Sequence, residues 1–364
     1  MIFGRITAGL LLVLTFFSSC TKIGPEMMHT DRFDYTAAVA DSWNEQVLLN
    51  IVRLRYNAWP VFVGIDQIVT SYTLEHTGSA RVIGRRGISD VLTNDQLEAG
   101  WVGKFSERPT VIYKPLSGKQ YVSAFLTPVQ PASVLALMET GWPADHLGRI
   151  AFRSVNEHYN TKADYGVMYR TDAEFAAFLA LLKELQNADA VKISIVKRSD
   201  KEDGGEDVSM LIFPERLTPE LRIELQKVKA DLGLDVSRNT YKIVRNSLVN
   251  DPGEIRIQGR SILQVLISLA TGVEVPKEHF QAQIAPPLEP IPEKNQTGLP
   301  PLMIVKSGPQ KPESAFVAVR YQDMWFWIDN RDHDSKRSLV YALALITLLD
   351  SDSKTGGSVV IPVN

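Results

Sequence analysis

The residues best suited to chemistry lie together near the C-terminus, in the stretch 325–337. This stretch holds carboxylates, one imidazole and several cations, and oxygen ligands grouped on a loop suit hard metal cations or acid–base chemistry. The candidate residues of a functional turn are Asp329, Arg331, Asp332, His333 and Lys336. Their spacing does not fit an EF-hand calcium loop, because counting from Asp329 puts Asp334 where that loop needs glycine and Tyr341 where it needs glutamate.

The same turn also has a purely structural interpretation, which the sequence favours. It joins an expected strand, 325–328, to an expected helix, 335–349. Lys336 and Arg337 would lie at the positive end of that helix, where cations are disfavoured. We expect Asp334 to cap the helix, with the two earlier aspartates nearby to offset the cations.

Arg53 is a further candidate, because it belongs to the strongest helical pattern of the chain, 37–56, which is apolar on most sides. A buried guanidinium costs several kcal/mol unless carboxylates or carbonyls receive it. We therefore expect Arg53 to be a buried charge in a structural ion pair, with ligand binding as the alternative.

Other catalytic patterns do not fit the sequence. The six histidines are scattered without an HExxH pair, and no glycine-rich phosphate loop is present. The sequence therefore predicts no catalytic residue, no metal and no cofactor.

The elements that would position these residues are helices and short strands in alternation. Hydrophobic periodicity and turn residues predict the helices 37–56, 119–126, 131–139, 145–158, 172–185, 218–232, 261–269 and 335–349. The expected strands are 61–63, 68–74, 80–83, 110–113, 190–196, 208–213, 240–244, 254–257, 302–305, 315–320, 325–328 and 358–363. Residues 76–79 are expected to form a hairpin turn between two of these strands, and 199–206 another.

This order of elements predicts an α+β fold of mixed helices and a largely antiparallel sheet. A proline-rich linker precedes a small C-terminal strand-helix-strand element. The expected divisions are a signal peptide at 1–19, a tether at 20–35, a mainly helical α+β region at 36–165, an α+β module at 166–283, the linker at 284–301 and the C-terminal element at 302–364.

Composition is that of an ordinary globular chain, with 45% hydrophobic and 22% charged residues. The formal net charge of -3, with both signs interspersed, gives no broad cationic field. Nucleic-acid binding is therefore not expected.

The first twenty residues read as an export signal. Arg5 precedes the apolar run 6–17, and small residues follow before Cys20. The run would span only about 18 Å as a helix, less than the roughly 30 Å of a hydrocarbon core, so cleavage is expected rather than a permanent span. Cys20 is the only cysteine of the chain, so no internal disulfide forms.

The end of this signal resembles the lipobox of bacterial lipoproteins. The resemblance implies that Cys20 is diacylated at its thiol and becomes the first residue of the mature protein, held at a membrane by its acyl chains. Phe17 departs from the leucine that such boxes most often carry. Thr21 rather than aspartate follows the cysteine, which by the same resemblance implies the outer membrane. We expect the anchored chain to face the periplasm, although the sequence does not distinguish this from the outer surface. The runs 42–56 and 325–336 resemble proteobacterial lipoproteins without a known activity, and they imply none here.

These observations favour a non-catalytic, lipid-anchored envelope protein that binds or assembles with an envelope partner. Two alternatives stay open. One is a periplasmic enzyme with a site built from Arg53, Asp329, Asp332 and His333, and the other is a lipoprotein that binds a small ligand.

Overall fold

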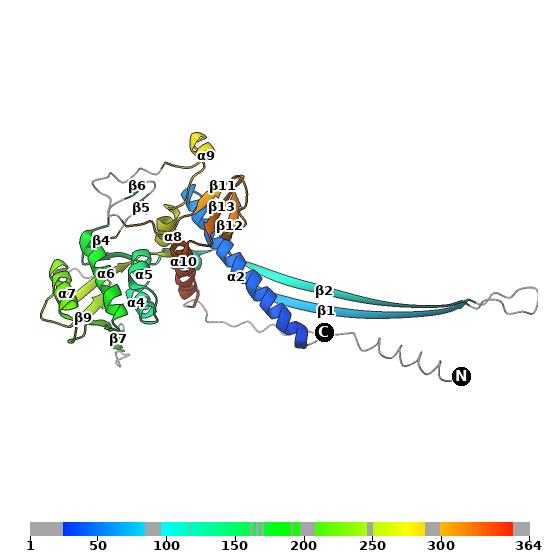
Figure 1. The fold of residues 1–364 in the computed structure, drawn as a ribbon, viewed down its shortest axis with the longest axis horizontal. Coiled ribbons are helices and arrows are strands. Elements are labelled where there is room, and N and C mark those ends of the chain that lie inside the picture. Colours follow the sequence, from blue (N-terminus) through cyan, green and yellow to red (C-terminus); the bar gives the residue numbers. More distant parts are fainter. Residues whose placement is uncertain are drawn as a thin grey trace, which may run out of the picture. The chain divides into compact units, whose positions relative to one another are not determined.

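A computed structural model describes residues 25–83, 96–116, 118–160, 163–164, 167–168, 171–190, 192–196, 208–245, 250–287 and 299–351 (Figure 1). The chain has an α+β fold, as predicted. The signal peptide, Cys20, the turn 199–206, much of the proline-rich linker and the expected strand 358–363 lie outside the described residues. The chain divides into two compact units, Val61–Tyr121 and the remainder.

The larger unit contains nearly all the helices. Their bounds are α2 Pro25–Arg55, α4 Pro131–Glu139, α5 Ala144–Ala151, α6 Ala173–Asn187, α7 Pro219–Asp231, α8 Ile262–Ala270, α9 Lys277–Gln281 and α10 His333–Ser351, with α3 Lys119–Leu126 at the division between the units. No helix of the described residues combines the length and apolarity that crossing a membrane requires.

A six-stranded sheet forms one half of this unit, in the order β4-β3-β10-β9-β8-β7. Its strands are β3 Phe152–Val155, β4 His158–Tyr159, β7 Lys192–Val196, β8 Val208–Ile212, β9 Thr240–Val244 and β10 Glu254–Gly259. All neighbours are antiparallel except β9 and β10, which are parallel. Helix α6 packs against α5 and α7, and the predicted core face of α6 is buried at Phe175, Phe178, Leu179 and Leu182.

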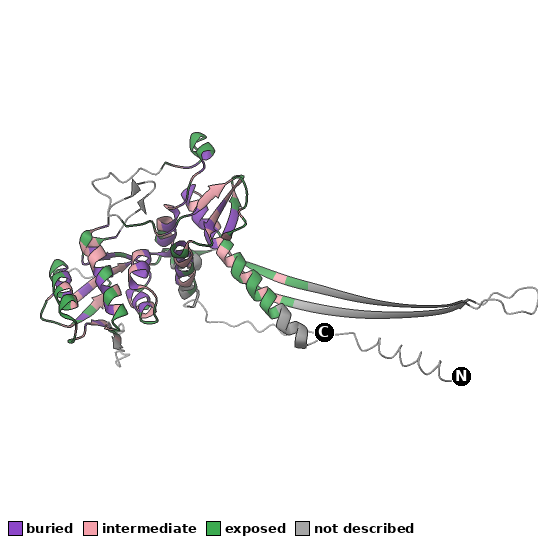
Figure 2. Ribbon diagram, viewed as in Figure 1, coloured by how far each residue is buried: buried purple, intermediate pink, exposed green. Residues whose placement is uncertain are grey.

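The second half of the unit is built around the C-terminal part of α2. Val47, Leu48, Ile51 and Val52 are fully buried, whereas residues 32–46 of the same helix are exposed or partly exposed (Figure 2). The helix packs on α8, α10 and the three-stranded antiparallel sheet β11-β13-β12. That sheet consists of β11 Lys306–Gly308, β12 Ala315–Tyr321 and β13 Met324–Asp329, and a further small hairpin joins β5 Ala163–Asp164 to β6 Val167–Met168.

Three predicted element boundaries in this unit were wrong. Helix α2 begins at Pro25, so part of the segment expected as a tether is helical. The helix expected over 145–158 ends at Ala151, because the chain then joins the sheet as β3 and turns back through Asn156 and Glu157, both with positive φ. The strand expected at 302–305 makes only an isolated parallel bridge, between Val305 and Val273, and β11 begins after it.

The smaller unit is a long antiparallel ribbon of two strands, β1 Phe62–Ile83 and β2 Gln96–Leu116 (Figure 1). At about 3.3 Å per residue each strand extends about 70 Å. The turn expected at 76–79 was wrong, because those residues continue the ladder and pair with 100–103. The short strands expected at 61–63, 68–74 and 80–83 belong to β1, and the strand expected at 110–113 belongs to β2. A bulge interrupts the register at Asp66.

Candidate functional site

The predicted turn begins at Asp329, the last residue of β13, whose carboxylate is paired with two cations. It accepts hydrogen bonds from Lys306 Nζ at 3.2 Å and from the Arg331 side chain at 3.3 Å, and from the Arg331 backbone N–H at 3.0 Å. These donors, first of all the Arg331 guanidinium, hold the pKa of the Asp329 carboxyl well below its usual range. Asp329 therefore stays ionised and bound to Lys306 and Arg331. A carboxylate held in this way is a weak base, so it does not suit the role of a proton acceptor.

The cap of α10 is Asp332 rather than Asp334. Its Oδ1 accepts the backbone N–H of Ser335 at 3.0 Å, and its Oδ2 accepts the Ser335 hydroxyl at 2.6 Å. The expectation of Asp334 was wrong because α10 begins at His333, which moves the capping position toward the N-terminus. Asp334 instead pairs with Arg337 at 3.1 Å, three residues further along the helix.

The remaining candidates of the turn do not converge on a common point. Lys336 Nζ donates to Asn330 Oδ1 at 2.9 Å and lies 4.8 Å from the centre of the Phe316 ring. His333 is exposed. Within the described part of the chain, no group of three His, Cys, Asp or Glu side chains could hold a metal ion. The geometry of the turn is that of a helix start with local ion pairs.

Arg53 lies in the buried C-terminal part of α2, but the expected ion pair is not found among the described residues. Its Nε is buried and has no hydrogen-bond partner. The neighbouring Arg55 donates to the Pro286 carbonyl at 2.6 Å, and burial lowers the pKa of its guanidinium. No hydrogen bond or ion pair within the described residues joins Arg53 to Asp329, Asp332 or His333. The site expected for an enzyme is therefore not assembled through direct contacts.

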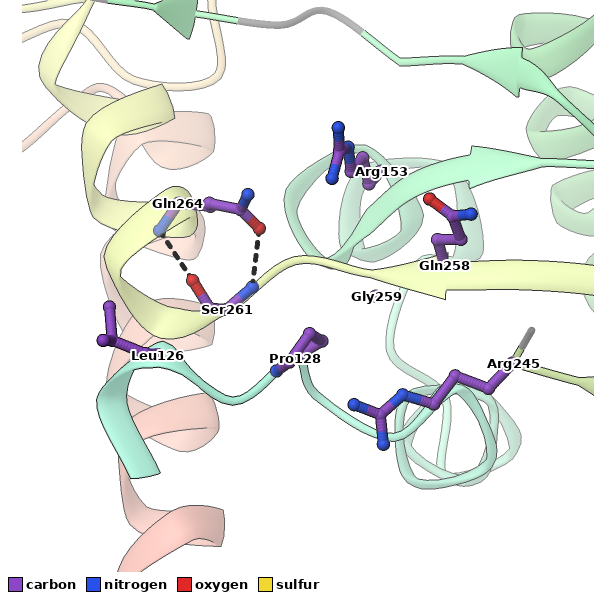
Figure 3. A pocket seen from close by; sticks show the side chains of 8 residues that line it. All are labelled: Leu126, Pro128, Arg153, Arg245, Gln258, Gly259, Ser261 and Gln264. Atoms are coloured by element: carbon purple, nitrogen blue, oxygen red, sulfur yellow. Dashed lines mark hydrogen bonds between the residues drawn. The ribbon is translucent and has the colours of Figure 1, made fainter. Parts of the chain in front are cut away.

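A pocket that sequence reasoning missed lies in the larger unit, where β3, β10 and α8 come together (Figure 3). Its volume is about 370 Å³. The residues that line it are Leu126, Pro128, Arg153, Arg245, Gln258, Gly259, Ser261 and Gln264. We call it the arginine pocket, because the charged residues of its described lining are Arg153, from β3, and Arg245, just after β9.

One wall of the arginine pocket is the start of α8. Ser261 and Gln264 form a reciprocal capping box, with Gln264 N donating to Ser261 Oγ at 3.3 Å and Ser261 N donating to Gln264 Oε1 at 3.0 Å (Figure 3). The opposing segment is held close, because Val129 N donates to the Arg260 carbonyl at 3.0 Å. Gly259 permits this approach, since a Cβ there would lie 2.1 Å from the Val129 carbonyl oxygen.

The electrostatics of the arginine pocket favour an anion. Among the described residues that line it there is no carboxylate. Behind it, Arg260 is buried and donates to the carbonyls of Arg149 at 2.9 Å and Ile150 at 3.3 Å. Burial, together with the charges of Arg149 and Arg153, lowers the pKa of Arg260 to about 10, so it remains cationic at neutral pH. Guanidinium groups bind carboxylates and phosphates well, although Figure 3 shows Arg153 and Arg245 on different walls rather than as one clamp.

Only one part of the arginine pocket has a sequence signal. Residues 261–264 match the S-x-x-Q pattern of a capping box before an apolar run. The order of the strands brings Pro128, Arg153 and Arg245 close to that helix start. No local sequence pattern specifies this order.

Neither a protein-family model, nor a curated protein, nor a solved structure matches this chain.

Proposed function

We propose that this protein is a non-catalytic assembly component of the bacterial envelope, anchored to the outer membrane by acyl chains on Cys20 and facing the periplasm. The anchor rests on the lipobox-like end of the apolar segment 6–17 and on the single cysteine of the chain. The assembly role rests on the β1–β2 ribbon.

The ribbon carries the proposal because it is a two-stranded sheet of unusual length. Its strands have 22 and 21 residues, and within the described part of the chain no third strand pairs with either edge. Two-stranded sheets alone are marginally stable in water, and open edges offer rows of backbone donors and acceptors to other chains. Val69, Ile112 and Tyr113 of the ribbon are also 43%, 45% and 64% exposed. These features fit a surface that another protein completes.

The test is purification of the full lipidated protein from detergent-solubilised envelopes after chemical cross-linking. We expect a complex of defined stoichiometry. Val69→Lys places a charge on the ribbon and should weaken the complex, because charged residues on edge strands oppose pairing with other chains. Val340→Lys is the matched control, because Val340 is a similarly exposed valine, at 45%, on α10. A monomer without cross-linked partners would contradict the assembly role.

The anchor is tested separately by Cys20→Ala. We expect this variant to leave the membrane fraction, because it has no thiol to acylate, and the wild-type N-terminus to carry the mass of acyl chains. A Cys20→Ala protein that stays in the membrane fraction to the same extent would contradict lipid anchoring, whatever the result of the complex assay.

A second candidate function is binding of a small anion, which the arginine pocket favours. Calorimetric titration with inorganic phosphate should show saturable binding to the wild-type protein, and Arg245→Gln should weaken it. Arg216→Gln, at another exposed arginine outside the pocket, is the control. Binding that both variants reduce equally would indicate a general charge effect and contradict a pocket site.

A further inference from the structure

We propose that the partner of the ribbon is the ribbon of a second copy of this chain, with β1 of one copy beside β2 of the next. This inference rests on the assembly role proposed above and names the partner for it. It requires that both outer edges of the ribbon be suitable for antiparallel pairing with each other.

The lengths and directions of the strands meet this requirement. With 22 and 21 residues, β1 and β2 match over their whole length. Because they are antiparallel in one copy, placing β1 of the next copy beside β2 continues the antiparallel alternation. One type of contact then uses both edges, whereas pairing β1 with β1 would leave the β2 edges open. The association is head-to-tail rather than two-fold.

Charges within the ribbon are complementary in its own register. The ladder places Glu75 opposite Lys104 and Arg81 opposite Glu98. If a neighbouring copy pairs in the same register, each of these positions again meets the opposite charge on its second side. Opposite charges across a ladder stabilise pairing and like charges oppose it. The register that folds one ribbon therefore also suits the contact between two.

The alternation of residue types gives the ribbon two unlike faces. Register pairs such as Leu74–Phe105 and Val82–Leu97 alternate with Glu75–Lys104 along the ladder, and successive positions of a strand belong to opposite faces. Each added ribbon would extend the apolar face and the polar face together. A wider two-faced sheet is more stable than the two strands alone.

Prolines indicate which part of the ribbon pairs. Pro109 and Pro115 lie toward the C-terminal end of β2 and cannot donate to a neighbouring strand. Residues 70–83 and 96–108 contain no proline. We therefore place the centre of the contact between copies in this part of the ribbon, with Val69 next to its border.

Disulfide cross-linking suits this protein, because its one native cysteine, Cys20, has no free thiol once it is acylated. Two differently tagged full-length copies are produced together, one with Thr73→Cys and one with Ser106→Cys, which are opposite each other in the register. Both changes nearly preserve side-chain size. Since each copy has one new thiol, a disulfide between the tags can form only between chains. Because neighbouring copies associate at random, only some contacts bring the two cysteines together, and we expect a clear band of this mixed dimer after oxidation.

The control replaces Thr73→Cys by Ser79→Cys, six residues along the same strand and about 20 Å away from the proposed partner position. It should give little mixed dimer. Three results would overturn the inference: equal dimer from both combinations, no mixed dimer while copies associate in another way, or no mixed dimer while a different protein copurifies. The last leaves the assembly role standing, whereas a monomer without any partner would remove both.

Discussion

Gly259→Ala tests the close approach that shapes the arginine pocket. Its new Cβ would lie 2.1 Å from the Val129 carbonyl oxygen, whereas ordinary contact begins near 3.4 Å. The segment carrying Val129 would have to retreat by more than 1 Å, although Val129 is 4% exposed and its N–H donates to Arg260. Overpacking costs about 1–3 kcal/mol and loss of the hydrogen bond about 1 kcal/mol. We expect a total destabilisation of about 2–4 kcal/mol.

Denaturant unfolding followed by circular dichroism measures this change. Gly308→Ala is the matched control, because a Cβ there would meet only the Trp327 ring, at 3.3 Å, and a side chain can yield by a few tenths of an ångström. We expect the control to change the free energy of unfolding by less than about 1 kcal/mol. If Gly259→Ala were as stable as the control, the 128–130 segment would not be held against β10 as described. Weaker phosphate binding in Gly259→Ala would further indicate that this wall belongs to the pocket.

Three further predictions concern buried and capping groups. Burial lowers the pKa of His146 below its ordinary value. As the pH falls below about 6.5, the unfolded chain therefore binds a proton at His146 before the folded chain does, and the free energy of unfolding decreases. His146→Gln should flatten the pH dependence of the free energy of unfolding measured across that range. Tyr56→Phe removes the 2.7 Å hydrogen bond to buried His279, and thermal unfolding should show a loss of about 1–3 kcal/mol. Asp332→Ala removes the cap of α10 and should cost about 0.5–2 kcal/mol, whereas the same measurement on His333→Ala should show little change.

Helices with local end signals could be predicted closely from the sequence. Thr218 accepts the Leu221 N–H at the start of α7, and Gly233 follows its end with φ +69°. Pro131 begins α4, and Gly141 follows it with φ +98°. These residues act through bonds to their neighbours in sequence, so their effect does not depend on the rest of the fold.

The ribbon could not be predicted, because its signals conflict locally. Gly78 and Ser79 are typical turn residues, yet the ladder continues through them, since each pairs with a residue of β2, the next strand along the chain. Similarly, the residues after Ala151 continue a helical pattern but enter the sheet beside β10. In both places pairing with another strand decides the conformation, and the residues that form the local turn or helix pattern do not specify that strand.

The charged residues of the turn 329–337 and of the arginine pocket show the same limit of prediction from local sequence. Acids and bases are adjacent in the sequence of the turn 329–337, which suggests chemistry. Adjacency also lets them neutralise one another, as Asp329 does with Arg331 and Asp334 with Arg337. Arg153 and Arg245 are far apart in sequence, and the other described residues of the pocket that they share are neutral. Charge left uncompensated by its neighbours is what can attract a ligand, and in this chain tertiary structure creates it.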